Sequence, residues 1–199
     1  MDTSKITGHL IVVNAPTGSG KGSLITHVRE KYPQVTKKIS CTTRKPRPGE
    51  VDGVDYFFMS RETFEGKITE GAFVEWAEYG GNLYGTLVSE LEGRLLNGEI
   101  VLAELEIQGV EQLKKVFPKE HLTIIYIEAG DWESARKRIL NRAPMTEEQL
   151  EKRHGRFMTE QAGKENADII IQNQDGMLDE AKIVFEGIIK DIIEKQTHG

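Results

Sequence analysis

A glycine-rich turn that contains one lysine is the first group of residues whose spacing suggests chemistry. It reads Ala15-Pro16-Thr17-Gly18-Ser19-Gly20-Lys21-Gly22-Ser23 and directly follows the apolar run LIVVN. Backbone N–H groups at the start of a helix bind phosphate, glycines allow the backbone angles that this requires, and a lysine can reach terminal phosphates. We therefore interpret residues 15–23 as a phosphate-binding loop, with a glycine-rich turn that binds no ligand as the alternative.

Two positions of this loop depart from the pattern G-x-x-x-x-G-K-[ST]. Ala15 stands where the first glycine is expected, and Gly22 stands where a hydroxyl that contacts Mg²⁺ usually follows the lysine. An alanine at the first position costs free energy only if the site needs a positive φ or a very close approach of the phosphate. Ser23, one residue further on, is the candidate for the contact to Mg²⁺, either directly or through a water molecule.

The elements that must position this loop can be predicted from apolar runs. Residues 9–15, 99–105, 122–129 and 167–173 are short and almost continuously apolar, which is typical of buried parallel strands. Helical patterns separate these runs, and an amphipathic helix is expected near the end of the chain. The alternation predicts an α/β fold, a P-loop core of three layers in which helices flank a parallel sheet.

Two segments do not fit the alternation of strands and helices. Residues 37–90 are rich in Gly, Pro, Thr and aromatic residues, and we expect them to form a small, mostly antiparallel insertion. Residues 138–156 are highly charged and are interrupted by Pro144, so they form either a mobile helical lid or a solvated helical hairpin. The predicted organisation is one domain, 1–199, with a core of residues 1–36 and 91–199.

The composition excludes several classes of partner. The chain has 199 residues and a net charge of −6, which argues against a general nucleic-acid or anionic-membrane binder. A small phosphorylated ligand is still allowed, since a pocket needs only a few cations. Cys41 is the single cysteine, so no disulfide framework or cysteine metal cluster is expected, and no apolar run reaches the roughly 20 residues of a membrane span. We expect a soluble, cytoplasmic protein.

Three further motifs follow the phosphate loop in a fixed order. They read SCTTRKPRPGEVDGVDYFF from Ser40, FVEWAEYGGNLYGT from Phe73 and LAELEIQGV from Leu102. In this order the motifs closely resemble the guanylate kinase family, enzymes that phosphorylate GMP with ATP, and the resemblance extends from about Leu10 to Asn173. It implies that residues 15–23 and Asn173 bind ATP, with Mg²⁺ as the cofactor.

The resemblance also implies a set of GMP-binding residues. These are Ser40, Arg44, Arg47, Tyr56, Glu75, Tyr84, Thr86, Glu104 and Glu106. The chemistry agrees, because guanine presents N1–H and N2–H₂ donors and an ionised carboxylate such as Glu75 only accepts hydrogen bonds. Hydroxyls can donate to the guanine O6, and guanidinium groups fit the phosphate. Trp76, between these motif residues, we interpret as a core aromatic rather than a base-stacking one.

The charged segment then acquires a predicted catalytic role. Arg138, Arg142 and Arg153 match the lid arginines of the family, and together with Lys21 and Arg44 they are expected to neutralise charge on the migrating phosphoryl group. The alternative is that these arginines are surface residues in ion pairs within helices.

The chain also departs from the family pattern at a few positions. Glu106 stands where an aspartate is usual, and the lid contains Arg142-Ala143-Pro144. Near the adenine pocket the chain reads Gln172-Asn173-Gln174-Asp175, with Asn173 retained.

The predicted function is an ATP-dependent GMP kinase that also accepts dGMP. Two alternatives are open: a non-catalytic protein-binding module of guanylate-kinase type, and a kinase for AMP or dTMP. The oligomeric state cannot be predicted from the sequence.

Overall fold

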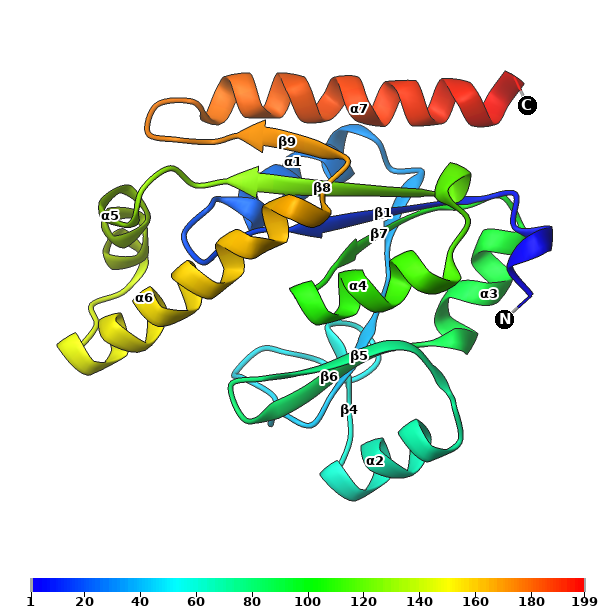
Figure 1. Ribbon diagram of the computed structural model, residues 1–199, viewed down its shortest axis with the longest axis horizontal. Helices are drawn as coiled ribbons and strands as arrows, with labels where there is room; N and C mark the ends of the chain where they lie inside the picture. Colours follow the sequence, from blue (N-terminus) through cyan, green and yellow to red (C-terminus); the bar gives the residue numbers. More distant parts are fainter. Residues whose placement is uncertain (1, 199) are drawn as a thin grey trace.

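A five-stranded, wholly parallel sheet forms the centre of the computed structural model, which describes residues 2–198 (Figure 1). In spatial order its strands are β2 (Val35–Lys37), β7 (Ile100–Glu104), β1 (His9–Asn14), β8 (Leu122–Glu128) and β9 (Ile169–Gln172). The four strands predicted from apolar runs are all present. β2 was not predicted, because three residues are too few to show a pattern.

Helices cover both faces of this sheet. The covering helices are α1 (Lys21–Lys31), α3 (Val88–Leu96), α4 (Ile107–Val116) and α7 (Leu178–His198). Val13 of β1 belongs to one apolar cluster with Leu24 of α1 and Phe185 of α7. Val12, its neighbour, belongs to the other cluster with α3 and α4, because successive strand residues point to opposite faces. The predicted α/β fold with a parallel sheet flanked by helices is therefore confirmed.

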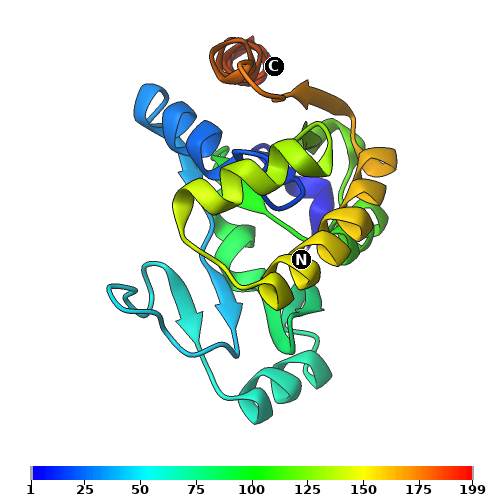
Figure 2. The same ribbon diagram turned by 90° about the vertical axis from the view of Figure 1, so that its left-hand side faces the viewer.

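A second, smaller sheet lies within the segment that the sequence assigned to an insertion (Figures 1 and 2). It has the order β4 (Tyr56–Phe58), β3 (Ser40–Thr42), β6 (Asn82–Leu87) and β5 (Phe73–Tyr79). The β3–β6 and β5–β6 pairs are antiparallel and the β3–β4 pair is parallel, so the prediction of a mostly antiparallel sheet is confirmed. Helix α2 (Arg61–Thr69) was not predicted, and it inserts Phe64 into the small apolar core of this sheet.

The charged segment forms parts of two helices, α5 (Trp132–Arg142) and α6 (Glu147–Glu160), separated by the linker that contains Pro144. Asp131 caps α5, and Thr146 and Gln149 form a reciprocal capping box at the start of α6. Three short 3₁₀ helices complete the elements: η1 (Thr3–Lys5), η2 (Lys119–His121) and η3 (Gln161–Asn166). Helix α5 lies beyond the carboxyl ends of β8 and β9, the edge at which ligands bind in open α/β sheets (Figure 1).

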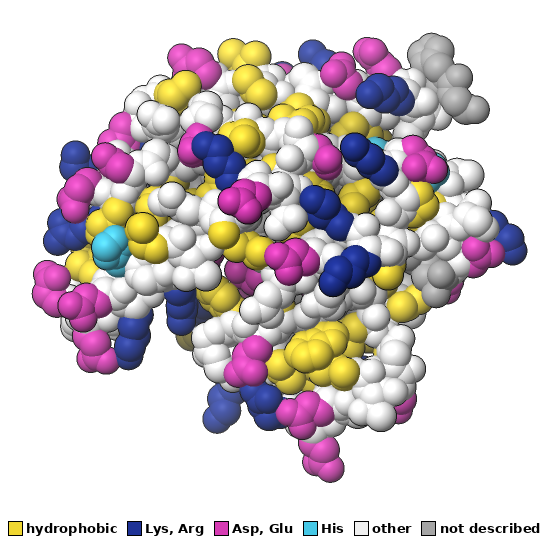
Figure 3. All heavy atoms as spheres, viewed as in Figure 1, with side chains coloured by type: hydrophobic (Ala, Val, Ile, Leu, Met, Phe, Trp, Pro, Cys, Tyr) yellow, Lys and Arg dark blue, Asp and Glu magenta, His cyan; other side chains and the backbone are white. Residues whose placement is uncertain are grey.

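The surface carries charges of both signs. On the face drawn in Figure 3, Lys and Arg side chains are interspersed with Asp and Glu. None of the helices in residues 2–198 combines the length and the apolar character needed to cross a bilayer.

Candidate active site

The phosphate loop connects β1 to α1 and has the geometry that the sequence predicted. Gly18 and Gly20 have φ values of +79° and +81°, the left-handed region that favours glycine. A Cβ at Gly20 would lie 2.5 Å from the amide nitrogen of Asn173, which itself donates to the Ser19 carbonyl at 2.7 Å. The Asn173 side chain therefore holds the loop at its turn, and the loop lines a cavity at the start of α1.

The two unusual loop positions are accommodated differently. Ala15 is buried and does not have a positive φ, so its methyl group causes no backbone strain. A Cβ at Gly22 would meet no atom within 4 Å, so the structure leaves room for the side chain that is missing there. Ser23 is exposed and lines the hollow beside the loop, with Arg138 and Asn173, rather than the loop cavity itself.

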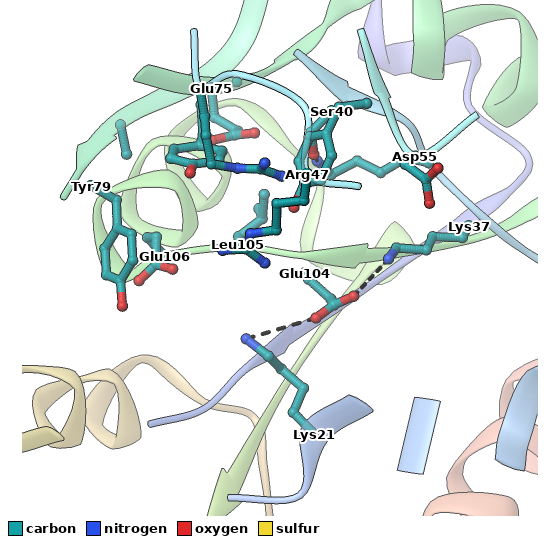
Figure 4. A pocket seen from close by; sticks show the side chains of 16 residues that line it. Lys21, Lys37, Ser40, Arg47, Asp55, Glu75, Tyr79, Glu104, Leu105 and Glu106 are labelled. Carbon is teal, nitrogen blue, oxygen red and sulfur yellow. Dashed lines mark hydrogen bonds and ion pairs between the residues drawn. The ribbon is translucent and has the colours of Figure 1, made fainter. Parts of the chain in front are cut away.

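Lys21 forms part of a chain of three charges at the centre of the site. Its amine lies 3.8 Å from one oxygen of Glu104, and the amine of Lys37 lies 2.8 Å from the other oxygen (Figure 4). Burial alone would raise the pKa of Glu104, but Lys21 and Lys37 outweigh it and lower that pKa. Glu106 faces the same space, and burial raises its pKa although Lys21 and Arg156 act in the opposite direction.

A second cavity, of about 230 Å³, lies between the core and the insertion. All of the predicted GMP-binding residues line it except Thr86, which is buried behind Glu75. Glu75 is 3% exposed, and its carboxylate accepts a short hydrogen bond from the Thr86 hydroxyl. Burial raises the pKa of Glu75, while Lys38 and the Thr86 bond act in the opposite direction. The structure thus presents a buried acceptor at the end of this cavity.

Gly109 of α4 is the reason that Glu75 can lie so close to this helix. A Cβ at position 109 would lie 2.5 Å from Oε2 of Glu75. The glycine of the QGV motif therefore makes space for the carboxylate rather than for the backbone.

Arg44 is fixed in the mouth of this cavity by an acidic neighbour. Its guanidinium donates to both oxygens of Glu50, at 2.8 and 2.9 Å, and lies over the ring of Tyr56. These bonds raise the pKa of Arg44 and lower the pKa of Glu50 to about 2. Glu50 also accepts the backbone N–H of Arg47, so one carboxylate orders the whole turn.

The three predicted lid arginines all lie beside the phosphate loop. Arg153 of α6 donates to the Thr17 hydroxyl at 3.0 Å. Arg138 of α5 donates to the Gly18 carbonyl at 3.3 Å and to Asp175 at 3.0 Å. Arg142 is exposed and lines the loop cavity. The alternative of surface ion pairs within one helix does not describe these contacts.

Several residues of the site were missed by the sequence interpretation. Lys37, Lys38, Asp55 and Tyr79 line the second cavity, and Glu160 lines the loop cavity. Glu160 accepts the Thr17 N–H at 2.7 Å and the Tyr79 hydroxyl at 3.1 Å. Its spacing of seven residues from Arg153 on one helix was a usable signal, since such residues share a face.

The prediction for Trp76 was wrong. Its side chain is 37% exposed on the outer face of β5 and is not part of a core. The residues around it alternate between the pocket face and solvent, so Trp76 points away from Glu75 and Ala77.

The fold and the site define a class of enzyme. A phosphate loop at the carboxyl edge of a parallel sheet faces a second, arginine-lined pocket, and arginines of helices α5 and α6 lie beside the loop. This is the arrangement of a P-loop kinase that brings together two phosphorylated substrates.

Comparison with known proteins identifies the family. A sequence profile of guanylate kinase matches residues 7–192, so the chain belongs to the guanylate kinase family and is a nucleoside monophosphate kinase. The guanylate kinase of Rubrobacter xylanophilus is 42% identical over 84% of this chain and 87% of that protein. That of Parasynechococcus marenigrum is 36% identical over 92% of this chain and 98% of its own. The crystal structure of guanylate kinase from Anaplasma phagocytophilum superposes with a TM-score of 0.72 at 26% identity, covering 96% and 87% of the two chains. The family predicted from the three motifs is confirmed.

Proposed function

We propose that this chain transfers the terminal phosphoryl group of ATP to GMP, giving ADP and GDP, with dGMP as a second acceptor. The observation that carries the proposal is that the loop cavity and the second cavity adjoin. Lys21, Glu104 and Glu106 line both of them, so two nucleotides bound there have their phosphates on either side of these residues.

The residues divide between the two substrates. ATP binds at the loop, residues 15–23, with Asn173 at its edge. GMP occupies the second cavity, where Glu75 accepts from the guanine N1–H and N2–H₂ groups and Ser40 and Thr86 supply hydroxyls. Arg44, Arg47, Tyr56 and Tyr84 hold its phosphate, with Glu104 and Glu106 at the inner wall.

The chemistry requires positioning and charge stabilisation rather than a general base, because the phosphate of GMP is already anionic. Lys21, Arg44 and the lid arginines Arg138, Arg142 and Arg153 supply positive charge around the migrating group. Closure of the lid over both nucleotides excludes water and so suppresses hydrolysis of ATP.

Mg²⁺ is the proposed cofactor, and the oxygen groups at the loop suit it. Glu104 and Glu106 present carboxylates to the loop cavity, and hard oxygen ligands with retained waters are what Mg²⁺ prefers. Ser23, directly or through water, is the proposed hydroxyl contact, and the ion would neutralise phosphate charge.

Since ATP and GMP are supplied in the cytoplasm, a cytoplasmic location accompanies this proposal, and we propose no nucleic-acid or membrane partner.

The test is a coupled assay with ATP, Mg²⁺ and one acceptor at a time. We expect GMP to be phosphorylated far faster than AMP or dTMP. Preference for AMP would refute the role of Glu75, and absence of phosphoryl transfer to any acceptor would favour the non-catalytic binding module.

Lys21→Ala tests the catalytic assignment in the same assay. Loss of the loop lysine is expected to lower kcat by about 100-fold or more, with thermal unfolding almost unchanged, because Lys21 contacts phosphate rather than the core. The matched control is Lys31→Ala, at the far end of α1, which should retain normal turnover. Near-normal turnover in Lys21→Ala would contradict the assignment.

A further inference from the structure

Lys38 is a buried lysine in the base-binding cavity to which the proposed function gives no task. Its residue exposure is 4%, and it lies between β2 of the core and β3 of the insertion. Its backbone N–H donates to the Leu102 carbonyl at 3.1 Å, which fixes its position against β7. Lysine is almost never this deeply buried without a specific reason, because burial disfavours an ammonium group.

The hydrogen bonding of Lys38 is unusually simple. Within residues 2–198, the amine has one hydrogen-bond acceptor, Oγ of Ser40, at 2.6 Å. Ser40 lines the cavity and is one of the hydroxyl groups assigned to the guanine base. Lys38 therefore contacts a side chain, Ser40, that is itself proposed to bind the guanine base.

The direction of this bond has a chemical consequence. An ammonium group has three donors and no acceptor, so the Ser40 oxygen must be the acceptor. The Ser40 hydroxyl hydrogen cannot then point at Lys38, and the described part of the chain offers it no other acceptor. The hydrogen is left to be donated into the cavity.

Two carboxylates of the same cavity act to keep Lys38 in its ammonium form. The pKa of Lys38 is lowered, chiefly by burial and further by Lys37, while Glu75 from β5 and Glu104 from β7 act in the opposite direction. The opposite charges of these carboxylates offset part of the cost of burying an ammonium group, and the hydrogen bond to Ser40 satisfies one of its donors.

We propose that Lys38 is a positioning residue for acceptor specificity: it holds the Ser40 hydroxyl so that its hydrogen points toward the 6-oxo oxygen of the purine. Lys38 occupies one acceptor position of the hydroxyl oxygen and leaves its hydrogen for the cavity, so a purine with a good acceptor at C6 is favoured. With an amino group at C6, an N–H donor of the base would face the O–H donor of Ser40. This inference depends on the proposed placement of the base beside Glu75 and Ser40.

The experiment compares kcat/KM for GMP, 6-thio-GMP and IMP in four proteins: wild type, Lys38→Met, Ser40→Ala and the double variant. 6-Thio-GMP keeps N1–H and the 2-amino group but presents sulfur, a weak acceptor, at C6. IMP keeps the 6-oxo group and lacks the 2-amino group, so it reports on Glu75. Methionine matches the length of the lysine stem, and thermal unfolding verifies that each variant is folded.

We expect the wild type to prefer GMP over 6-thio-GMP by about 10-fold or more, as for a buried hydrogen bond. Lys38→Met should reduce that preference by about fivefold while leaving the preference for GMP over IMP in place. In the Ser40→Ala background, adding Lys38→Met should have little further effect, because the hydroxyl through which Lys38 acts is absent.

Lys37→Met is the matched control. It removes one positive charge from the same cavity at the adjacent position, but Lys37 pairs with Glu104 rather than with Ser40. Its effect on turnover should not be accompanied by a change in the ratio of GMP to 6-thio-GMP.

Three results would overturn the proposal. They are an unchanged preference in Lys38→Met, an additive effect in the double variant, and an equal loss of both base preferences, which would place the action of Lys38 on Glu75. If Ser40→Ala itself leaves the 6-thio-GMP preference unaltered, the fault lies instead in the proposed contact of Ser40 with the base.

Discussion

Some charged residues of this site are oriented by hydrogen bonds to other side chains of the protein rather than to a substrate. Arg44 is the clearest case, because Glu50 accepts both of its guanidinium hydrogen bonds before any nucleotide binds. Such a pair reduces the loss of side-chain entropy when a phosphate arrives, since the guanidinium is already oriented. It also competes with that phosphate for the same donors, and the balance between the two effects can be measured.

Glu50→Gln is predicted to raise the KM for GMP by about three- to tenfold with little change in kcat, because the ordering of Arg44 and Arg47 outweighs the competition. Steady-state kinetics at saturating ATP provide the measurement. Glu65→Gln, which affects an exposed ion pair with Arg61 in the same insertion, is the control and should leave KM unchanged. A lower KM in Glu50→Gln would show that competition dominates.

At the scale of elements, the sequence predicted those that carry long apolar runs. The runs around His9–Asn14 and Leu122–Glu128 are long enough to be recognised, and they became central strands. β2 has three residues and α2 is mostly polar, so neither shows a clear period. Both are stabilised by tertiary contacts that a local pattern does not contain.

The site could be predicted only where a motif recorded it. Glu75 and the loop lysine belong to recognisable motifs, and the structure brings their motifs together. Lys38 and Glu160 do not. The significance of Lys38 comes from its burial, and that of Glu160 from its hydrogen bond to Thr17, which is far away along the chain. Trp76 was misassigned because a strand residue can be core or surface depending on a register that one sequence does not reveal.

Gly109→Ala provides a test at the level of a helix. Alanine is the better helix former by about 1 kcal/mol, so α4 should be retained or strengthened. The added methyl group displaces the Glu75 carboxylate, and we expect the KM for GMP to rise by about 10-fold or more. Gly93→Ala in α3, where a Cβ meets nothing within 4 Å, is the matched control. Unchanged kinetics in Gly109→Ala would mean that Glu75 does not need its present position.

Gly22→Ser tests the missing hydroxyl at the start of α1. Because a side chain meets no atom there, we expect the free energy of unfolding to rise by about 0.5 kcal/mol. The Mg²⁺ concentration for half-maximal turnover should fall. Ser23→Ala should raise that concentration in the wild type, and it should do so less in the Gly22→Ser background. No effect of Ser23→Ala would remove Ser23 from the proposed metal contacts.

On the scale of the whole molecule, three parts meet at one carboxylate. Glu160 at the end of α6 accepts hydrogen bonds from Thr17 of the phosphate loop and from Tyr79 of the insertion. Arg156 of the same helix lies over the Tyr79 ring, 4.7 Å from its centroid. Helix α6, the phosphate loop and the insertion are therefore linked by direct side-chain contacts, and not only through the central sheet.

His9 makes the stability of the whole fold depend on pH. Burial, with smaller effects of His121 and Lys195, lowers the pKa of His9 from 6.5 to about 4. The unfolded chain binds this proton more readily, so the contribution to stability is complete above pH 6.5 and is lost as the pH falls through 4.

We expect about 3 kcal/mol of unfolding free energy to be lost through His9 between pH 6.5 and 4. Denaturant unfolding of wild type and His9→Gln measures it, and the variant should show a flatter dependence on pH. His154→Gln, at an exposed ring on the lid, serves as the control. An identical slope in His9→Gln would contradict the assignment.

The place of β1 between β7 and β8 also has a consequence for biosynthesis. β1 is translated early, yet both of its neighbours are translated only after the four strands of the insertion, which extend from Ser40 to Leu87. Strands β3, β4, β5 and β6 can thus pair while both edges of β1 are still unpaired. We expect the base-binding sheet to assemble on the nascent chain before the core does, and the exposed β1 to be the segment that chaperones protect.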